Sequence, residues 1–345
     1  MASYPVGTLR LGVDMHTYKR YSKGWKKVAD AFIYAIPIVQ AFKAHKRVDV
    51  LIDTKDSFFC KGYRTPDGAI KGARITILPD GTVLQGAYSL LSDHLTLHDQ
   101  HTHGHWDIMY KNPSGTYTYR YSLKKVKQSH QQKYKKVHEF NAIYPTLLYN
   151  VTQALSLRQD SMALVLYTLL ATYMRVGNKV YFITHGHKGL TTLKKEDVHI
   201  TGNTVTFCFL GKNGVPHTIT KTFPQQYIRW LHMLMRANTE FLFTKNNKAI
   251  TEKDFAQAFV KYAKQSFYPH IVRSHYATYE VQRFFAQHAK PTKKQIKEVL
   301  TSIAQELGHK KYSKKLHDWQ SYYTITLSHY IEPRLVKKIQ TILHK

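Results

Sequence analysis

The chain has 345 residues, a length that suits two domains better than one. Its 51 Lys and Arg residues exceed its 22 Asp and Glu residues by 29, and 21 His residues can add further charge. Because 43% of the residues are hydrophobic and 13% are aromatic, the composition excludes a disordered basic tail. A folded protein with this much positive charge needs an anionic partner, most commonly the phosphate backbone of a nucleic acid.

Neither export nor membrane insertion is expected. The longest apolar run, residues 162–174, is shorter than the roughly 20 residues that span a bilayer. The N-terminal segment has no unbroken apolar stretch and no small-residue cleavage site. Cys60 and Cys208 both lie in apolar surroundings, so we expect two buried, reduced thiols. These features predict an intracellular protein with no membrane partner.

Residues 1 to about 125 contain short alternating runs typical of β-hairpins. Residues 73–78 and 82–84 flank the turn Pro79-Asp80-Gly81, and residues 106–110 and 116–121 flank a second turn. The second pair carries an aromatic stripe of Tyr117, Tyr119 and Tyr121, since alternate strand residues share a face. These tyrosines either pack a barrel or contact nucleic acid.

A dense histidine cluster lies between the two predicted hairpins. Its members are His94, His98, His101, His103 and His105. No Cys and only three Asp residues lie nearby, so the cluster is better explained as a solvated loop than as a metal site.

The composition then shifts to a Lys- and Gln-rich stretch after Leu123, typical of a linker or a basic solvated helix. We place the domain boundary there, near residue 130. Helical periodicity dominates beyond it, and Ser156 with Gln159 predicts a capping box before an apolar helix that ends near Tyr173.

One β insertion interrupts the predicted helices. It comprises residues 198–200, 204–210 and 215–222, and the connector Gly211-Lys212-Asn213-Gly214 contains the Asn-Gly pair favoured in hairpins. Lys212 is therefore predicted at a hairpin tip. A further helix is expected from Pro291 to about Leu307.

Nucleotide-binding glycine loops and paired-aspartate magnesium motifs are absent from the sequence, which argues against NTP-driven or two-metal chemistry. The C-terminal two thirds instead carries isolated functional residues in distinctive contexts. They are Arg175 in MRVGN, Lys212 in FLGKNGVPH, Arg273 in IVRSHYAT, His309 in LGHKK and Tyr330 in SHYIEPR.

These motifs resemble, in their order along the chain, those of the small type IB DNA topoisomerases of poxviruses, large DNA viruses and bacteria. Two further segments, HKGLTTLKKEDVHI and NPSGTYTYRY, share the resemblance. The resemblance runs from about Trp106 to Ile339 and leaves residues 1–85 unassigned. It implies an α+β bilobed clamp, with a β-rich DNA-clamping domain over residues 1–130 and a mainly α catalytic domain over residues 131–345. Such a clamp would act on double-stranded DNA as a monomer, without an obligatory protein partner.

The resemblance also implies that Tyr330 attacks a DNA phosphodiester, and that the resulting 3'-phosphotyrosyl bond is later reversed. This relaxes supercoiled DNA without a cofactor, ATP or metal. Two guanidiniums can neutralise the charge that phosphoryl transfer develops, which suits Arg175 and Arg273. Lys212 would protonate the leaving sugar oxygen, and His309 would donate a hydrogen bond to a nonbridging oxygen.

DNA contacts outside the catalytic set are expected from two aromatic and three basic side chains. They are Tyr119, Tyr121, Lys124, Lys125 and Lys188.

Three alternatives remain open in the sequence. The pattern His270, Arg273, His275 resembles tyrosine recombinases, which share this catalytic domain and chemistry. The nucleophile could be Tyr322 or Tyr323, because 21 positions separate His309 from Tyr330 and suggest an insertion over residues 313–323. An architectural DNA-binding protein is a third class.

Overall fold

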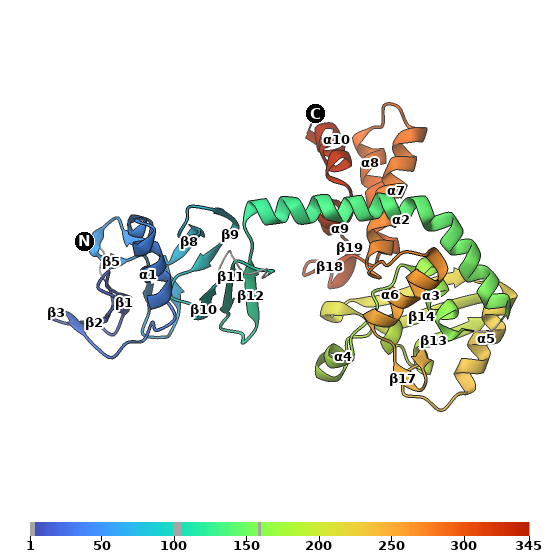
Figure 1. The fold of residues 1–345 in the computed structure, drawn as a ribbon, viewed down its shortest axis with the longest axis horizontal. Coiled ribbons are helices and arrows are strands. Elements are labelled where there is room, and N and C mark those ends of the chain that lie inside the picture. The colour runs from blue at the N-terminus through green and yellow to red at the C-terminus, as the bar shows by residue number, and fades with distance from the viewer. Residues whose placement is uncertain (1–3, 99–104, 158–159, 345) are drawn as a thin grey trace. The chain divides into compact units, whose positions relative to one another are not determined.

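The computed structural model describes residues 4–98, 105–157 and 160–344. The chain divides into two compact units, Met1–Gln132 and Lys133–Lys345, so the boundary falls within helix α2, Leu123–Leu157. Figure 1 shows strands in the first unit and mostly helices in the second. The α+β fold class predicted from the sequence is confirmed. Each unit has its own hydrophobic core.

The first unit is built from short strands and one helix, α1 (Ile36–Ala44). The strands are β1 Leu9–Leu11, β2 Thr17–Tyr21, β3 Gly24–Lys27, β4 Ile52–Asp53, β5 Asp56–Cys60, β6 Tyr63–Arg64, β7 Ile70–Lys71, β8 Arg74–Ile77, β9 Val83–Ser89, β10 Asp93–Leu97, β11 Ile108–Lys111 and β12 Tyr117–Arg120. They form a sheet in the order β3-β2-β1-β6-β7, a sheet β10-β11-β12, and the antiparallel pairs β4-β5 and β8-β9.

The two hairpins predicted in this unit are confirmed as β8-β9 and β11-β12. In the first, Gly81 takes a left-handed φ of 89°, and Leu78 N–H donates to Thr82 O at 2.9 Å. Side chains from both sheets and the apolar face of α1, including Val39 and Phe42, fill a single core. Local turn chemistry thus sets strand ends that long-range packing then holds together.

The second unit is mainly helical. Its helices are α2 from Lys133 onward, α3 Ser161–Thr172, α4 Lys179–His185, α5 Gln225–Arg236, α6 Glu252–Ala263, α7 Ile271–Gln287, α8 Lys293–Glu306, α9 Tyr323–Tyr330 and α10 Pro333–His344. Its strands are β13 Val198–Thr201, β14 Thr204–Leu210, β15 Pro216–Thr222, β16 Thr244–Lys245, β17 Lys248–Ala249, β18 Lys310–Ser313 and β19 Asp318–Ser321.

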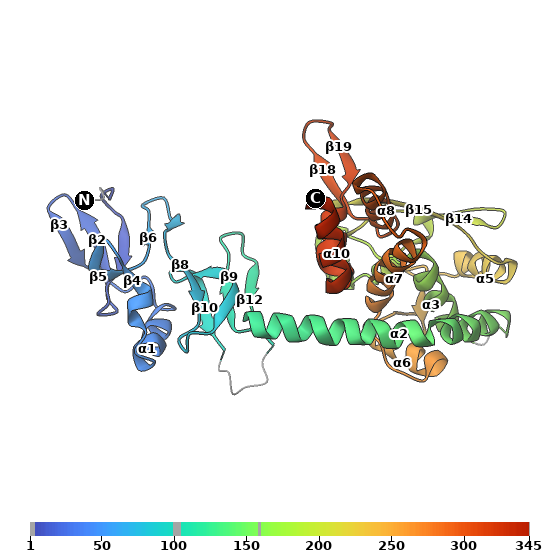
Figure 2. The same ribbon diagram turned by 90° about the horizontal axis from the view of Figure 1, so that it is seen from above.

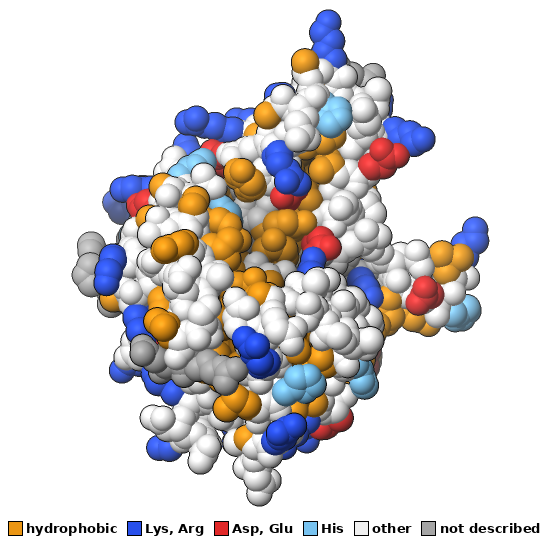
Figure 3. Space-filling model, turned by 90° about the vertical axis from the view of Figure 1, so that its right-hand side faces the viewer, with side chains coloured by type: hydrophobic (Ala, Val, Ile, Leu, Met, Phe, Trp, Pro, Cys, Tyr) orange, Lys and Arg blue, Asp and Glu red, His pale blue; other side chains and the backbone are white. Residues whose placement is uncertain are grey.

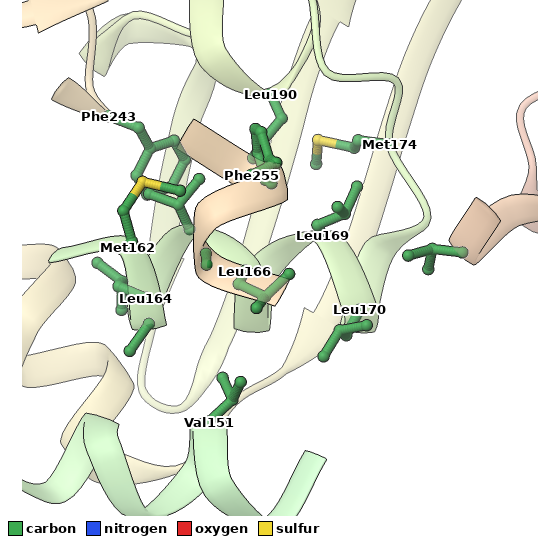
Figure 4. Close-up of a cluster of buried hydrophobic side chains, with 14 of the residues drawn as sticks. Val151, Met162, Leu164, Leu166, Leu169, Leu170, Met174, Leu190, Phe243 and Phe255 are labelled. Carbon is green, nitrogen blue, oxygen red and sulfur yellow. The ribbon is translucent and has the colours of Figure 1, made fainter. Parts of the chain in front are cut away.

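Helix α3 forms the centre of this unit. A helix that is apolar all round must be buried on every side, and nine of its twelve residues are buried. Figure 4 shows Leu164, Leu166 and Leu169 of α3 surrounded by Val151 of α2 and Phe255 of α6. This core fixes where the chain leaves α3, immediately before Arg175.

The predicted cap of α3 is wrong. Ser156 lies inside α2, and Gln159 lies outside the described residues. Asp160 caps the helix instead, because its Oδ1 accepts a hydrogen bond from Met162 N–H at 2.9 Å. The segment after Leu123 is a continuous helix, and Pro145 lies within it, where Figure 1 shows the helix bending in its second half.

The predicted β insertion is confirmed as the antiparallel sheet β13-β14-β15. Its second turn uses left-handed backbone at Asn213 (φ 63°) and Gly214 (φ 69°), as an Asn-Gly turn requires. Lys212 lies in this turn and is exposed. The helix predicted from Pro291 is also confirmed as α8, whose cap is Thr292 with Gln295.

Helices α7, α8, α9 and α10 pack together around a separate apolar cluster (Figure 2). Between α8 and α9, the strands β18 and β19 form a hairpin whose base is closed by Tyr322 N–H donating to His309 O at 2.8 Å. The residues that lengthen the spacing from His309 to Tyr330 therefore fold into this hairpin.

Both cysteines are free, as expected, but only Cys60 is buried. Cys208 lies on β14 and is half-buried, so that part of the expectation is wrong. Burial raises the pKa of Cys60 to about 11. Across the described ranges, no helix combines the length and apolar character needed to cross a bilayer.

Candidate active site

Tyr330 is the last residue of α9 and is 4% exposed. Its phenol oxygen accepts a hydrogen bond from Arg175 Nη2 at 3.0 Å and lies within hydrogen-bond distance of His270 Nε2, at 3.3 Å. Tyr322 caps the start of α9 and Tyr323 is its first residue. Tyr322 contacts His309 through its backbone N–H, and among the described residues neither the Tyr322 nor the Tyr323 hydroxyl bonds to Arg175, Arg273 or the His309 ring, so the geometry favours Tyr330 over both.

Arg175 follows α3 on a loop held by backbone hydrogen bonds. Its carbonyl accepts from Leu190 N–H at 2.8 Å, and Val176 O accepts from Thr191 N–H at 2.7 Å. The two segments approach so closely that a Cβ at Gly189 would lie 2.6 Å from Gly177 N. A glycine is therefore required at position 189 for the guanidinium to reach Tyr330.

Arg273 lies in the first turn of α7 and is 3% exposed. Its guanidinium donates to Leu307 O at 2.7 Å and also to Tyr173 O. It lies 5.4 Å from the centroid of the Tyr330 ring. Burial lowers the pKa of Arg273 to about 10, which still leaves it positively charged at neutral pH. A fixed charge is thus placed next to the phenol.

His309 follows α8 and is also buried. Its Nε2 accepts from Arg273 Nη2 at 3.0 Å, and its Nδ1 contacts Thr326 Oγ1 at 2.7 Å. Burial, then the charges of Arg273 and Arg175, lower the pKa of His309 to about 2, so the imidazole is neutral. Gly308 before it has φ 63°, and a Cβ there would lie 2.2 Å from the His217 ring.

Lys212 approaches the same region from the β14-β15 turn. It lines a cavity of about 320 Å³ together with Arg175, Asn178 and residues of α4. A second, smaller pocket is lined by Lys212, Arg175 and Arg273 together. The hairpin tip therefore places Lys212 at the same pocket as the two arginines.

His270 completes the surroundings of the phenol. Desolvation, then the charges of Arg273, Arg175, Lys133 and Lys212, lower its pKa to about 3. At neutral pH the ring is uncharged, and its Nε2 can accept the phenol proton.

The structure brings together all five residues that sequence reasoning assigned to catalysis. They are Arg175, Lys212, Arg273, His309 and Tyr330, contributed by five separate elements. Sequence reasoning noted His270 only as part of a pattern that resembles tyrosine recombinases, and it missed Lys133 and Thr326. The motif position three residues before Arg273 could have pointed to His270. Lys133 and Thr326 act through tertiary contacts that no local pattern reveals.

The five residues assigned to DNA contacts differ in their surroundings. Tyr119 and Lys124 are exposed, and Tyr121 is half-buried just beyond β12. Lys125 donates to Asp107 at 2.6 Å, and Lys188 donates to both carboxylate oxygens of Asp197 at 2.7 and 2.8 Å. Contact with DNA at all five positions stays a prediction. Lys125 and Lys188 would have to share their charge between a DNA phosphate and the carboxylate that each already binds.

Lys and Arg residues outnumber Asp and Glu residues in the chain by 51 to 22. On the face drawn in Figure 3, Lys and Arg side chains are more numerous than Asp and Glu side chains.

His101 and His103 of the histidine cluster lie outside the described residues, while His98 contacts the Trp106 carbonyl at 3.0 Å. Among the described residues, no group of three His, Cys, Asp or Glu side chains could hold a metal ion.

The site thus consists of a buried tyrosine beside two arginines and a neutral histidine. In a comparison with protein families, the family described as the catalytic core of eukaryotic DNA topoisomerase I matches residues 121–334. This match covers more than half of the chain. The chain belongs to that family.

A relative and two solved structures add to this comparison. DNA topoisomerase 1B of Acanthamoeba polyphaga mimivirus is 25% identical over 227 residues, which cover 56% of this chain and 64% of the relative, just under two thirds of its length. The XerH site-specific recombinase in a post-cleavage complex with palindromic difH is 15% identical, with a TM-score of 0.34 over 59% of this chain and 52% of that one. Its pre-cleavage complex with difH is 15% identical, with a TM-score of 0.31 over 47% and 45%.

Proposed function

We propose that this chain is a type IB DNA topoisomerase, which relaxes supercoiled DNA by cutting and rejoining one strand through Tyr330. The observation that carries the proposal is the position of the Tyr330 phenol, 3.0 Å from Arg175 and beside Arg273 and His309. Family membership supports the same activity. The enzyme acts as a monomer inside a cell and needs neither ATP nor a metal ion.

The first step is attack by the Tyr330 oxygen on phosphorus. The phenol proton passes to His270 Nε2, which lies 3.3 Å away. The incoming phosphate places negative charge among the cations that depress the pKa of His270, so DNA binding makes this imidazole a better base. Arg175 and Arg273 neutralise the charge that develops on the nonbridging oxygens.

The second half of this step is departure of the sugar oxygen. The bond from phosphorus to the 5' oxygen breaks, Lys212 donates a proton to that oxygen, and a 3'-phosphotyrosyl ester with a free 5'-hydroxyl remains. The ester conserves the energy of the broken bond. Reversal of the same steps therefore reseals the strand without ATP.

His309 supplies a hydrogen bond to a nonbridging oxygen after one rearrangement. In the structure its Nε2 accepts from Arg273, so the proton lies on Nδ1 and faces Thr326. A hydroxyl can either accept or donate. Thr326 can therefore support the tautomer with Nε2–H once Arg273 turns to the phosphate.

The test is relaxation of supercoiled plasmid in EDTA without ATP. We expect a ladder of topoisomers, at a rate proportional to protein concentration as a monomer requires. Tyr330→Phe should bind DNA but form no covalent adduct, whereas Tyr322→Phe and Tyr323→Phe should still form one. Absence of a ladder with folded protein would reject the proposal and leave an architectural DNA-binding role.

A site-specific recombinase is the second candidate, favoured by one observation. His270 lies three residues before Arg273 and contacts the phenol, an arrangement with the His-x-x-Arg pattern of tyrosine recombinases. A recombinase joins strands from two paired sites. Exchange of ends between two duplexes, with a steep dependence on protein concentration and little relaxation of single plasmids, would favour it.

A further inference from the structure

The hairpin β2-β3 in the first unit is strongly basic. Residues 17–27 include Lys19, Arg20, Lys23, Lys26 and Lys27 and no Asp or Glu. Among the described residues, none of these five cations forms an ion pair with a carboxylate. The hairpin lies at the edge of its five-stranded sheet, with β3 outermost, and outside the family match that begins at residue 121.

The register places like charges directly opposite each other. Lys19 pairs with Lys26, and two like charges directly opposite each other disfavour the hairpin. Tyr21 shares their face, with Lys19 Nζ 5.9 Å and Lys26 Nζ 5.7 Å from its ring centroid. Opposite Tyr21 is Gly24, where an added Cβ would meet nothing within 4 Å. The two ammonium groups and the exposed phenol thus face open space.

We propose that Lys19, Tyr21 and Lys26 bind the phosphate backbone of duplex DNA, which gives the first unit a contact of its own with the substrate. A phosphate between the two ammonium groups relieves their repulsion, and the Tyr21 hydroxyl can donate to a phosphate oxygen. The choice of DNA as the anion rests on the proposed function. Such contacts strengthen binding to any sequence without reading bases.

The experiment measures the affinity for duplex DNA as a function of salt concentration, with full-length protein carrying Tyr330→Phe to prevent cleavage. Each phosphate contact contributes about 0.9 to the slope of log K against log salt concentration. Because the two ammonium groups share one phosphate, Lys19→Gln with Lys26→Gln should lower the slope by about 0.9. The matched control is Lys55→Gln with Lys71→Gln, two exposed lysines of the same unit, and Lys71 lies on the opposite edge strand β7.

Equal slopes for the hairpin variant and the control would overturn the proposal. So would a hairpin variant that loses binding to vesicles of anionic lipid while its DNA slope stays unchanged. Circular dichroism establishes that both variants fold. The readout is binding, so a missing plasmid ladder would reject the proposed function without affecting this result.

A second inference concerns Lys133 of α2, and it rests on contacts separate from those of the β2-β3 hairpin. Its Nζ donates to the carbonyl of His329, in the last turn of α9, and lies 5.5 Å from the centroid of the Tyr330 ring. Among the described residues it has no carboxylate partner, and burial lowers the pKa of Lys133 to about 8. A desolvated lysine without a counter-ion is costly, so its retention beside the phenol points to a role there.

We infer that Lys133 is a positioning residue for Tyr330. Carbonyls in the last turn of a helix lack intrahelical partners and carry partial negative charge, which a lysine ammonium satisfies. By binding the carbonyl next to Tyr330, Lys133 fixes the end of α9 and hence the direction of the phenol. Its charge also adds to the cationic field around His270. This role, too, rests on the proposed function.

Single-turnover formation of the covalent adduct, with protein in excess over DNA, tests this inference. Lys133→Met should slow adduct formation about tenfold, equivalent to about 1.4 kcal/mol, with DNA affinity unchanged. Lys133→Arg keeps the charge and the donor and should recover most of the rate. Lys135→Met, at an exposed position on the same helix, is the control.

Two results would overturn the positioning role. One is a wild-type rate for Lys133→Met. The other is an Arg variant as slow as the Met variant with both melting temperatures lowered, which would mark Lys133 as merely structural. Failure of the wild-type protein to form any adduct would instead reject the proposed function.

Discussion

The catalytic residues depend on neighbours that orient them, and Thr326 is the clearest case. It is fully buried, and its hydroxyl meets His309 Nδ1 at 2.7 Å. On the other side of the imidazole, Arg273 donates to Nε2 at 3.0 Å. The histidine therefore has one partner on each nitrogen, and the threonine determines which tautomers it can adopt.

We predict that Thr326→Val slows covalent adduct formation about tenfold. Valine has nearly the shape of threonine but leaves Nδ1–H buried without an acceptor, at a cost of about 1 to 3 kcal/mol. Rapid-quench measurement of adduct formation tests this. Thr341→Val on α10, whose hydroxyl only bonds to Lys337 O, is the control. A wild-type rate for the Thr326 variant would show that His309 needs no partner on this nitrogen.

At the scale of elements, the loop that carries Arg175 is the most constrained part of the site. Its backbone bonds to residues 190 and 191 fix its course, and Gly177 there takes φ 96°. The close approach at Gly189 leaves no room for a side chain, because the blocking atoms belong to the backbone. A methyl group there must displace the segment that holds the guanidinium near Tyr330.

We predict that Gly189→Ala reduces relaxation of supercoiled plasmid by at least tenfold and also lowers the melting temperature. Overpacking of this kind costs about 1 to 3 kcal/mol. Gly86→Ala is the matched control, because its nearest atoms would be those of Arg120 at an ordinary 3.6 Å. Full activity of the Gly189 variant would mean that the Arg175 loop adapts easily.

Sequence reasoning succeeded where structure depends on nearby residues. Asn213-Gly214 and Pro79-Asp80-Gly81 specify turns by local backbone preference, and the run Pro291-Thr292-Lys293-Lys294 marks a helix start. It failed at the start of α3, where Asp160 acts as the cap. The sequence of the basic segment after Leu123 did not distinguish a linker from a helix. Packing against the rest of the second unit determines that this segment is helical.

The candidate active site also divides into residues that local motifs identify and residues that tertiary packing alone brings together. Ordered motifs identified five residues, but the partners Thr326 and Lys133 lie 17 residues and nearly two hundred residues from the groups they contact. Neither belongs to a recognisable local pattern. Only the packing of α2 and α9 around Tyr330 brings them into the site.

At the scale of the whole molecule, buried neutral histidines couple folding to pH. His309 and His275 are 5% and 6% exposed, and burial lowers their pKa values to about 2 and about 4. An unfolded chain titrates these groups near pH 6.5. Below that pH the unfolded state binds protons that the folded state excludes, so the free energy of unfolding falls as the pH falls.

We predict that the free energy of unfolding of the second unit decreases between pH 6.5 and pH 4, by up to about 1.4 kcal/mol per pH unit for each such histidine. His275→Gln removes one titrating group and can keep the hydrogen bond to Asn141. The slope of its free energy of unfolding against pH should therefore be smaller than that of the wild type, by up to about 1.4 kcal/mol per pH unit, which corresponds to one proton. Urea unfolding at pH 7, 6 and 5, followed by circular dichroism, measures both slopes. His232→Gln, at an exposed position on α5, is the control. Identical slopes for wild type and His275→Gln would mean that His275 takes up a proton in the folded state, in contradiction to its burial and its neutral hydrogen bond.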